Sequence, residues 1–455
     1  MKTFFGTDGI RGVAGEPPLD RDTLWRVGVA LAETGYASKT KPRILFGRDT
    51  RISGGWIEQL LQNALAKAGI EAISDAGLIS TPGLAYLTRL HQYDLGVMIS
   101  ASHNPYQDNG IKIFGQDGFK LSDEEEMAIE RRINALKDRA PEVETTTSQA
   151  SYSHSPQLVG DYLAFLKEQM KGSLNSLRVG LDVCNGSASA IAPEVFKALG
   201  ATVSVINNQP DGRNINLNCG SLHLSGIVRL VKEQQLDLGV AFDGDADRSL
   251  FVTASGKIFD GDSVLYAFSL HFQANRALRM NKVVGTVMSN CALELALKQH
   301  GIELLRAAVG DRYVLEMMRQ VGANLGGEPS GHIVLSDCHT TGDGILTAVK
   351  LTEILSTRKV GLDELADGFR PYPQVLEGLR VRSKIPLEYS PEIGQMIEAA
   401  EGQLKGKGRI VVRYSGTEPL LRIMAEGEDR DQVEALVSAL KSRLASVLAS
   451  ASSSG

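Results

Sequence analysis

The same order of segments occurs three times along the chain, and this repeat restricts the possible folds more than any other feature. Each copy has an apolar strand, a polar loop, a helix with amphipathic spacing, a glycine and a second apolar strand. The copies span residues 41–74, 177–206 and 282–305, and their helices end before Gly69, Gly200 and Gly301. Glycine favours the left-handed conformation in which many helices end. Strands that alternate with helices predict parallel sheets with crossover connections, so we expect three similar α/β units.

The end of the chain has a different pattern, a helix at 391–404, strands at 409–414 and 420–426, and a helix at 429–448, which predicts a smaller α+β domain. Boundaries are expected at a Thr- and Ser-rich segment, 144–156, at a turn-like segment near Gly256, and at GFRPYP, residues 368–373. The predicted domains are α/β units at 1–155, 156–256 and 257–369 and an α+β unit at 370–455.

Composition excludes several classes of protein. The formal net charge is -6, so a general nucleic-acid partner is not expected. A membrane span is not expected either, because no run of about 18 apolar residues occurs. The four cysteines form no CxxC pair, which argues against structural zinc and a disulfide framework and fits a reducing cytoplasm. Asp8 and Arg11 interrupt the start of the chain before an apolar run can form, so we expect no signal peptide.

A polar loop with the sequence SASHNP follows the apolar strand at 95–99. Catalytic groups favour loops at the carboxyl ends of parallel strands. Ser102, beside His103, is therefore a candidate nucleophile, although a serine hydroxyl needs a base or a metal to react. A Ser-His-Asp hydrolase is not favoured, because no G-x-S-x-G motif surrounds Ser102. The alternative is a serine that caps a turn or a helix.

Asp243, Asp245 and Asp247 follow the apolar strand at 236–242. Three carboxylates at alternate positions repel one another unless a cation lies among them, and their oxygens suit Mg²⁺. An EF-hand is excluded, because its sixth position would be Arg248 and its twelfth Ala254. The pattern predicts a metal site, with a solvated acidic turn as the alternative.

Two later loops are candidate ligand-binding segments. The segment GGEPSGH, residues 326–332, carries groups that can bind a polar ligand, namely Glu328, Ser330 and His332. The segment RYSGTEP, residues 413–419, is followed by Arg422 on the next strand, and together they suggest a phosphate cradle. Either loop could be an ordinary turn. Four basic residues in loops of the first domain suit an anionic substrate as a set: Arg11, Arg48, Arg51 and Lys112.

These loops, in this order, resemble the α-D-phosphohexomutase superfamily over nearly the whole chain. The segments FGTDGIRG, GRDTRISG, SASHNP, DNGIK and VGDRYV look most like its bacterial branch that interconverts glucosamine 6-phosphate and glucosamine 1-phosphate toward UDP-N-acetylglucosamine. The resemblance implies three similar α/β domains and a smaller C-terminal domain around a central cleft. It implies a cytoplasmic isomerase, monomeric or homodimeric, that uses a phosphoserine, one Mg²⁺ per chain and a sugar 1,6-bisphosphate intermediate.

The resemblance also implies residue roles. Ser102 would carry the phosphate and complete the metal shell formed by Asp243, Asp245 and Asp247. The positions near the reacting phosphate would be Arg11, His103, Lys112 and Arg248, with His103 or Lys112 as the proton acceptor. The sugar would be bound by Glu328, Ser330 and His332. The phosphate that does not react would be bound by Arg413, Ser415, Gly416, Thr417 and Arg422.

Other functions stay open at this point. Pro329 departs from the residues expected in this branch, so a related mutase for mannose or glucose phosphates is an alternative. A Mg²⁺-dependent sugar phosphatase would share the aspartates but would release phosphate and would not need the loop at 413–419. A non-catalytic sugar-phosphate sensor would keep its role without Ser102.

Overall fold

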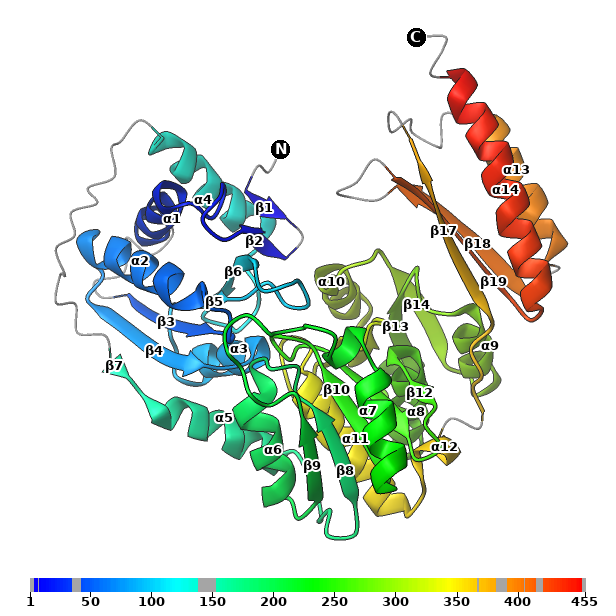
Figure 1. Ribbon diagram of the computed structural model, residues 1–455, viewed down its shortest axis with the longest axis horizontal. Coiled ribbons are helices and arrows are strands. Elements are labelled where there is room, and N and C mark those ends of the chain that lie inside the picture. The colour runs from blue at the N-terminus through cyan, green and yellow to red at the C-terminus, as the bar shows by residue number, and fades with distance from the viewer. Residues whose placement is uncertain are drawn as a thin grey trace.

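The computed structural model describes residues 4–6, 8–34, 42–137, 153–365, 368–381, 391–404, 406–414 and 420–451. Figure 1 shows four units that follow one another along an arc, with the N-terminal unit at one end and the C-terminal unit at the other. Most of the expected linker at 144–156 lies outside the described residues. Every described helix is too short or too polar to cross a lipid bilayer.

The first unit is a seven-stranded sheet in the order β1-β2-β6-β5-β3-β4-β7. The strands are β1 (Phe5–Gly6), β2 (Gly9–Val13), β3 (Arg43–Arg48), β4 (Ala72–Leu78), β5 (Leu95–Ile99), β6 (Asp108–Gly115) and β7 (Ser153–His154). The helices are α1 (Arg21–Glu33), α2 (Gly54–Lys67), α3 (Thr81–Leu90) and α4 (Asp123–Ala135). Strand β5 is buried along its whole length, which explains its unbroken apolar sequence.

The second unit is a five-stranded sheet in the order β12-β11-β10-β8-β9. The strands are β8 (Arg178–Asp182), β9 (Thr202–Ile206), β10 (Leu238–Phe242), β11 (Ser249–Thr253) and β12 (Ile258–Phe259). The helices are α5 (Pro156–Glu168), α6 (Ala188–Ala198), α7 (Ser225–Gln234) and the 3₁₀ turn η1 (Gly220–Leu222). The turn at Gly256, where φ is +86°, joins β11 to the antiparallel strand β12 within this sheet.

The third unit is a four-stranded sheet in the order β14-β13-β15-β16. The strands are β13 (Lys282–Thr286), β14 (Glu303–Ala307), β15 (Leu325–Gly327) and β16 (Ile333–Leu335). The helices are α8 (Gly261–Ala274), α9 (Cys291–Gln299), α10 (Asp311–Val321), α11 (Gly344–Arg358) and α12 (Leu362–Leu365), with the 3₁₀ turn η2 (Arg279–Asn281). Helix α11 packs against α5 and α6 of the second unit as well as α8, so the core continues from one unit into the next.

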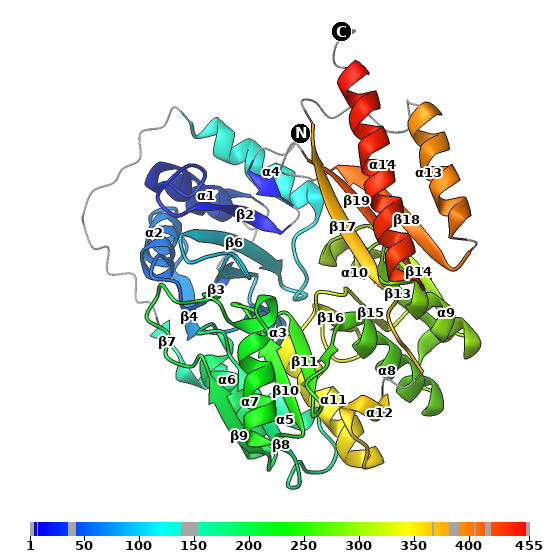
Figure 2. The ribbon, with the colours of Figure 1, turned by 45° about the vertical axis from the view of Figure 1, so that its right-hand side comes forward.

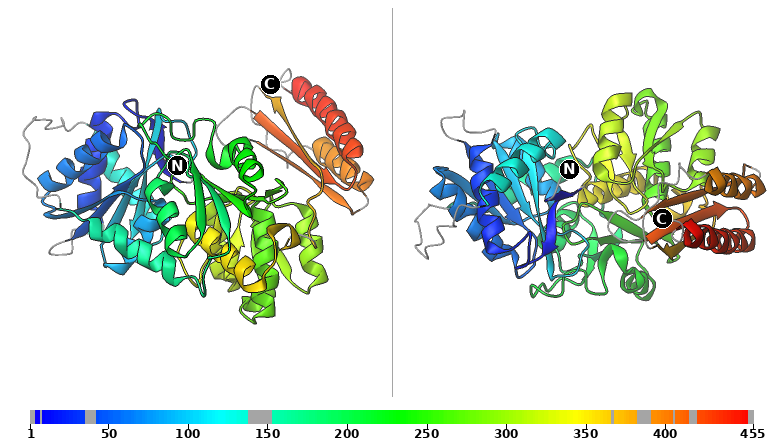
Figure 3. Two further views of the ribbon diagram at one scale, coloured as in Figure 1. Left: turned by 60° about the horizontal axis from the view of Figure 1, so that its bottom comes forward. Right: turned by 90° about the horizontal axis from the view of Figure 1, so that it is seen from above.

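The C-terminal unit has its own hydrophobic core and an antiparallel sheet in the order β17-β19-β18. Its elements are β17 (Gln374–Arg380), α13 (Pro391–Gln403), β18 (Gly408–Tyr414), β19 (Leu420–Gly427) and α14 (Arg430–Ala451). Figure 2 shows α9 and β14 of the third unit next to this sheet, and Figure 3 shows the unit at one end of the molecule. The smaller α+β unit predicted from the sequence is confirmed.

The three α/β units share one topology. In each, a first and a second strand pair in parallel, a third strand runs parallel to the first, and a fourth runs antiparallel to the third. The four strands are β3, β4, β5 and β6 in the first unit, β8 to β11 in the second, and β13 to β16 in the third. Gly69, Gly200 and Gly301 follow the equivalent helices with φ of +92°, +96° and +69°. The structure therefore confirms the predicted repeat of three similar α/β units, and the antiparallel fourth strand makes each sheet mixed.

Candidate active site

The polar loops of the three α/β units occupy the same place in the shared topology. Each joins the third strand of its unit to the fourth: β5 to β6, β10 to β11, and β15 to β16. These loops lie at the carboxyl ends of buried strands, where main-chain N–H groups are free to bind a ligand. Contacts between Ser102 and Asp243 and between Asp247 and His332 join the three loops. The fold therefore brings three chain segments that are far apart in sequence to one site.

Ser102 is buried at the centre of this site. Its Oγ donates a hydrogen bond of 2.7 Å to Oδ2 of Asp243 and lies 3.3 Å from Nδ1 of His103. Its φ is +52°, a left-handed conformation that few residues with a side chain adopt. Nη2 of Arg51 and Nδ2 of Asn216 each donate to the Ser102 carbonyl at 2.8 Å. The surrounding residues thus hold the serine in a conformation that it would not favour alone.

Arg51 and Asp49 form a buried ion pair that supports the serine loop. Nε of Arg51 lies 2.9 Å from Oδ2 of Asp49, and Oγ of Ser100 donates to the same oxygen at 2.6 Å. Burial raises the pKa of Asp49, although Arg51 acts in the opposite direction. The expectation that Arg48 and Arg51 serve an anionic substrate is corrected here. Arg51 is committed to Asp49 and main-chain carbonyls, and Arg48 pairs with Glu58 at 3.0 Å.

Asp243, Asp245 and Asp247 are buried, and one oxygen of each lies within 4.8 Å of the others. Burial and the two neighbouring aspartates raise the pKa of Asp243 well above its ordinary value. The Oδ1 atoms of Asp245 and Asp247 have no hydrogen-bond partner in the part of the chain that the structure describes. Buried oxygens without partners are costly. Three converging carboxylates with two such oxygens therefore fit a divalent cation that prefers oxygen ligands.

Gly244 allows the serine loop and the aspartate loop to approach each other. A Cβ atom at this position would lie 2.5 Å from the carbonyl oxygen of Ser102 and 2.9 Å from Nδ2 of Asn216. Both atoms belong to the network that holds Ser102, so neither can move without disturbing the serine. The glycine between the first two aspartates is thus required by the close contact of two backbones.

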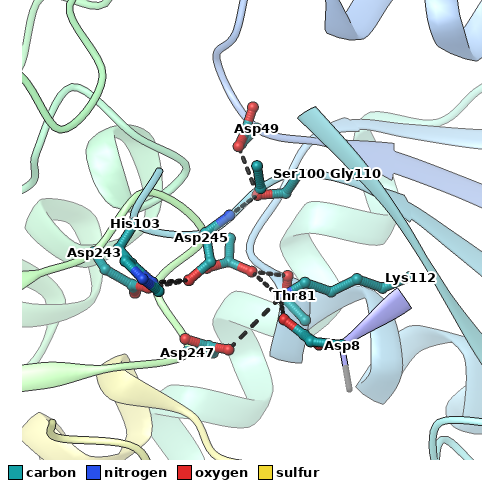
Figure 4. A network of polar contacts seen from close by, with 12 residues as sticks. Asp8, Asp49, Thr81, Ser100, His103, Gly110, Lys112, Asp243, Asp245 and Asp247 are labelled. Carbon is teal, nitrogen blue, oxygen red and sulfur yellow. Dashed lines mark hydrogen bonds and ion pairs between the residues drawn. The ribbon is translucent and has the colours of Figure 1, made fainter. Parts of the chain in front are cut away.

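Lys112 is a buried cation on β6 that lies among the carboxylates. Its Nζ lies 2.7 Å from Oδ2 of Asp245, 3.1 Å from Oδ2 of Asp8 and 3.8 Å from Oδ2 of Asp247, and Figure 4 shows it among these groups. Burial alone would lower the pKa of Lys112, but Asp245 and Asp8 raise it well above its ordinary value. Arg11 contacts Asp8 and donates to a main-chain carbonyl of the serine loop at 3.3 Å. The site therefore holds fixed positive charge beside Ser102.

His103 and Arg248 lie side by side next to the serine. Nη1 of Arg248 is 3.3 Å from Nδ1 of His103, and the main-chain N–H of Arg248 donates to Oδ1 of Asp243 at 3.2 Å. Burial and Arg248 lower the pKa of His103 to about 4. Its imidazole is consequently neutral near pH 7 and has a lone pair with which to accept a proton.

The third loop presents unpaired polar atoms to the same site. Oε1 of Glu328 accepts a hydrogen bond of 3.0 Å from the N–H of Gly310. His332 is 1% exposed, and its Nδ1 lies 3.6 Å from Oδ2 of Asp247. Among the described residues, Oγ of Ser330 and both ring nitrogens of His332 have no hydrogen-bond partner. Buried polar groups are normally paired, so Oγ of Ser330 and Nε2 of His332 are available to a polar ligand, whereas Nδ1 faces Asp247.

Arg413 and Arg422 lie directly opposite each other on β18 and β19. Burial and the neighbouring Arg422 lower the pKa of Arg413. Two adjacent guanidinium groups attract an anion with several oxygen acceptors. Three further predicted phosphate-binding residues lie outside the described part of the chain: Ser415, Gly416 and Thr417.

Asp8, Thr81 and Lys120 also belong to the site, although the sequence did not predict them. Asp8 contacts Lys120 as well as Arg11, and Oγ1 of Thr81 donates to Oδ2 of Asp245. The position of Asp8 within FGTDGIRG, three residues before Arg11, was a usable signal. Thr81 and Lys120 had none, because the partners that give them a role are distant in sequence.

Four domain models of the phosphoglucomutase/phosphomannomutase family match the chain. They are alpha/beta/alpha domain I at residues 2–140, domain II at 160–256, domain III at 260–372 and the C-terminal domain at 378–442. The chain therefore belongs to the phosphoglucomutase/phosphomannomutase family, and it is an enzyme of the mutase class. The superfamily resemblance seen in the loops is confirmed.

Similar bacterial proteins carry a more specific name. The phosphoglucosamine mutase of Solibacter usitatus is 49% identical over 95% of this chain and 96% of its own length. That of Koribacter versatilis is 46% identical over 94% of this chain and 93% of its own length.

Solved structures share the fold. A phosphoglucomutase/phosphomannomutase family protein from Burkholderia thailandensis superposes with a TM-score of 0.78 at 23% identity, covering 98% of this chain and 97% of its own. Aspergillus fumigatus N-acetylphosphoglucosamine mutase, solved in complex with GlcNAc-6P and magnesium, gives 0.69 at 17% identity, covering 98% and 96%.

Proposed function

We propose that this chain interconverts glucosamine 6-phosphate and glucosamine 1-phosphate, the step of a phosphoglucosamine mutase that leads toward UDP-N-acetylglucosamine. The names of relatives that are 49% and 46% identical over nearly the whole chain support this substrate. The observation that carries the reaction type is the 2.7 Å hydrogen bond between Oγ of Ser102 and Asp243. This contact supports the proposal, because a phosphate on a hydroxyl beside the aspartate cluster would also lie next to a metal ion that those aspartates bound.

In this proposal Ser102 carries the transferable phosphate, and Asp243, Asp245 and Asp247 hold one Mg²⁺ per chain together with that phosphate. When bound, such an ion draws negative charge from the phosphate oxygens and so lowers the barrier to transfer. The close approach of the three carboxylates supports this ligand set, as do the two carboxylate oxygens that lack a hydrogen-bond partner among the described residues.

Side chains of this protein would accept the proton and stabilise the charge during phosphoryl transfer. A sugar hydroxyl oxygen attacks phosphorus, the new O–P bond forms as the bond to Oγ of Ser102 breaks, and His103 accepts the hydroxyl proton. Lys112, Arg11 and Arg248 stabilise the negative charge on the phosphate oxygens. Because Lys112 is firmly charged among carboxylates, we assign it to charge stabilisation and the proton to His103.

The product of this transfer is a sugar 1,6-bisphosphate, which must turn over and return its other phosphate to Ser102. Glu328, Ser330 and His332 bind the sugar during both transfers. The phosphate that does not react is bound by residues of the C-terminal unit: Arg413, Ser415, Gly416, Thr417 and Arg422. The domain limits 1–155, 156–256, 257–369 and 370–455 belong to the same proposal, as do a cytoplasmic location and a monomeric or homodimeric state.

Rate measurements on matched substrates test this function. The enzyme should convert glucosamine 1-phosphate faster than glucose 1-phosphate or mannose 1-phosphate, measured as kcat/KM with sugar 1,6-bisphosphate present. A preference for glucose or mannose phosphate would identify a related mutase instead. Release of inorganic phosphate without exchange of isomers would identify a phosphatase, and normal biological activity of Ser102→Ala would identify a sensor.

A further inference from the structure

A cavity of about 590 Å³ lies between the first and third units, next to the site described above. One wall is the segment that follows β6, with Lys120 and Glu125, and the other is helix α10 with Asp311, together with His332. Figure 1 shows α10 facing the first unit across this region. His332 is 1% exposed; its Nδ1 faces Asp247, and its Nε2 has no hydrogen-bond partner among the described residues. A buried imidazole of this kind indicates that the cavity receives a polar ligand.

Asp311 is the carboxylate of this cavity that is best placed to meet the sugar. It is the first residue of α10, directly after Gly310, whose N–H donates to Glu328 at 3.0 Å. The loop between β15 and β16, which carries Glu328, therefore fixes the start of helix α10. The Asp311 side chain is 18% exposed, so it is largely desolvated but still faces the cavity.

The contact of Asp311 with Lys120 shows that this carboxylate can bind an ammonium group. Nζ of Lys120, a primary ammonium group from the first unit, contacts Oδ2 of Asp311 and also Asp8. Oδ1 of Asp311 accepts from the N–H of Arg312 at 2.8 Å. A carboxylate has about four acceptor sites, and these contacts use two of them. Asp311 can therefore bind a second ammonium group without releasing Lys120.

We propose that Asp311 determines the preference for amino sugar phosphates by accepting a charge-assisted hydrogen bond from the 2-ammonium group of the substrate. The 2-hydroxyl group of glucose phosphate is a neutral donor, so at the same place it can form a hydrogen bond to the carboxylate but no ion pair. The opposite charge of an ammonium group adds an attraction that is stronger in a partly desolvated cavity than in water. Lys120 is the positioning residue, because it contacts both Asp8 of the first unit and Asp311 of the third unit and so fixes where the two carboxylates lie. This inference rests on the proposed function, because it assumes that glucosamine phosphate is a substrate.

The test measures kcat/KM for glucosamine 1-phosphate and glucose 1-phosphate with the magnesium-loaded full-length protein. For Asp311→Asn, the ratio of the two values should fall about 10- to 100-fold, as expected for loss of a hydrogen bond to a charged group, through loss on the amino sugar alone. Glu303→Gln is the matched control, because Glu303 also belongs to the third unit but its side chain is exposed and lies outside the lining of the cavity. It should leave the ratio unchanged.

Two outcomes separate this inference from the proposed function. If the wild type prefers glucosamine phosphate but Asp311→Asn lowers both rates equally, Asp311 is structural and the inference is wrong. If the wild type does not prefer glucosamine phosphate, the proposed function itself fails.

A second variant keeps the test decisive if Asp311→Asn does not fold. Asp311→Glu retains the ion pair with Lys120 but moves the carboxylate by one methylene group. It should lower the same ratio in the same direction, and an unchanged ratio would overturn the proposal.

Discussion

Oγ of Ser102 and Oδ2 of Asp243 are 2.7 Å apart although 141 positions separate them in the sequence. The contact joins the loops that follow β5 and β10, which occupy equivalent positions in the first and second units. Asp243 also accepts from the main-chain N–H of Arg248, so its own loop fixes the carboxylate. The serine is thus held against an aspartate cluster by two copies of one supersecondary unit.

Replacing Ser102 by alanine should lower mutase turnover about 1,000-fold or more, because no other group would carry the phosphate between substrate positions. Intact-mass measurement should find one phosphate group on part of the wild-type protein and none on the variant. Ser225→Ala, at an exposed position at the start of α7, is the control and should keep both the phosphate and the activity. Near-normal turnover of Ser102→Ala would exclude a covalent role.

Gly244→Ala should separate the serine from the aspartates. The added Cβ would lie 2.5 Å from the Ser102 carbonyl oxygen, so one of the two loops must shift. We expect a stability loss of about 1–3 kcal/mol, typical of overpacking, and a fall in kcat much larger than that loss of stability would cause. Gly55→Ala meets no atom within 4 Å and serves as the control. Thermal unfolding and kcat measured together check this prediction, which fails if kcat is unchanged.

Metal removal should abolish turnover and magnesium should restore it, because the clustered carboxylates need a cation to offset their repulsion. Asp245→Asn should weaken Mg²⁺ binding at least about tenfold, as loss of a ligand contact does. Calorimetric titration measures the affinity directly. Asp237 lies just before β10, is half-buried and pairs with Arg178. Asp237→Asn should leave the affinity unchanged. Equal affinities for wild type and Asp245→Asn would place the metal elsewhere.

Asp262 on α8 should make stability depend on pH. Burial and the neighbouring Asp260 raise its pKa to about 8 in the folded protein, from an ordinary value of 3.8. Between these two values the unfolded chain releases the proton while the folded protein retains it, so unfolding becomes easier as pH rises. Below about pH 4 the stabilising effect is complete, and it is lost by the time pH passes about 8.

Asp262→Asn mimics the protonated carboxyl and should remove this dependence. The side chain accepts a 2.7 Å hydrogen bond from the N–H of Asn290, which an asparagine oxygen can also accept. The difference in Tm between the variant and the wild type should therefore grow from pH 5 to pH 8. A constant difference across this range would show that Asp262 is ionised in the folded protein.

Much of the fold could be predicted from local sequence. The apolar run at 95–99 coincides with β5, and the glycines at 69, 200 and 301 do adopt positive φ after their helices. These features depend on hydrophobic periodicity and on the conformational freedom of glycine, which act over a few residues. The C-terminal strands were predictable for the same reason, whereas β17 was missed because it lies beside the proline-rich break at 368–373.

From residue chemistry alone, the candidate site could be predicted only where a motif concentrated reactive groups, and the family resemblance supplied the expectation that Ser102 meets the aspartates. Three aspartates at alternate positions can be recognised in the sequence as a candidate metal site. A serine in a polar loop after a buried strand can likewise be recognised as a candidate nucleophile. Lys120 and Thr81 carry no such signal, since each gains its role from a carboxylate in another unit. Arg51 was predicted to serve the substrate because the sequence shows its charge. The sequence does not show that Asp49 is buried beside Arg51 and pairs with it.

The sequence by itself determined the units, because short-range periodicity and glycine placement decide where strands and helices begin and end. Only the tertiary structure decided which side chains share the site, because Ser102, Asp243 and His332 meet through the packing of separate sheets. That packing also decides which charged side chains are buried and which are paired. Burial and pairing depend on residues far away in the chain, so they cannot be predicted from a short stretch of sequence.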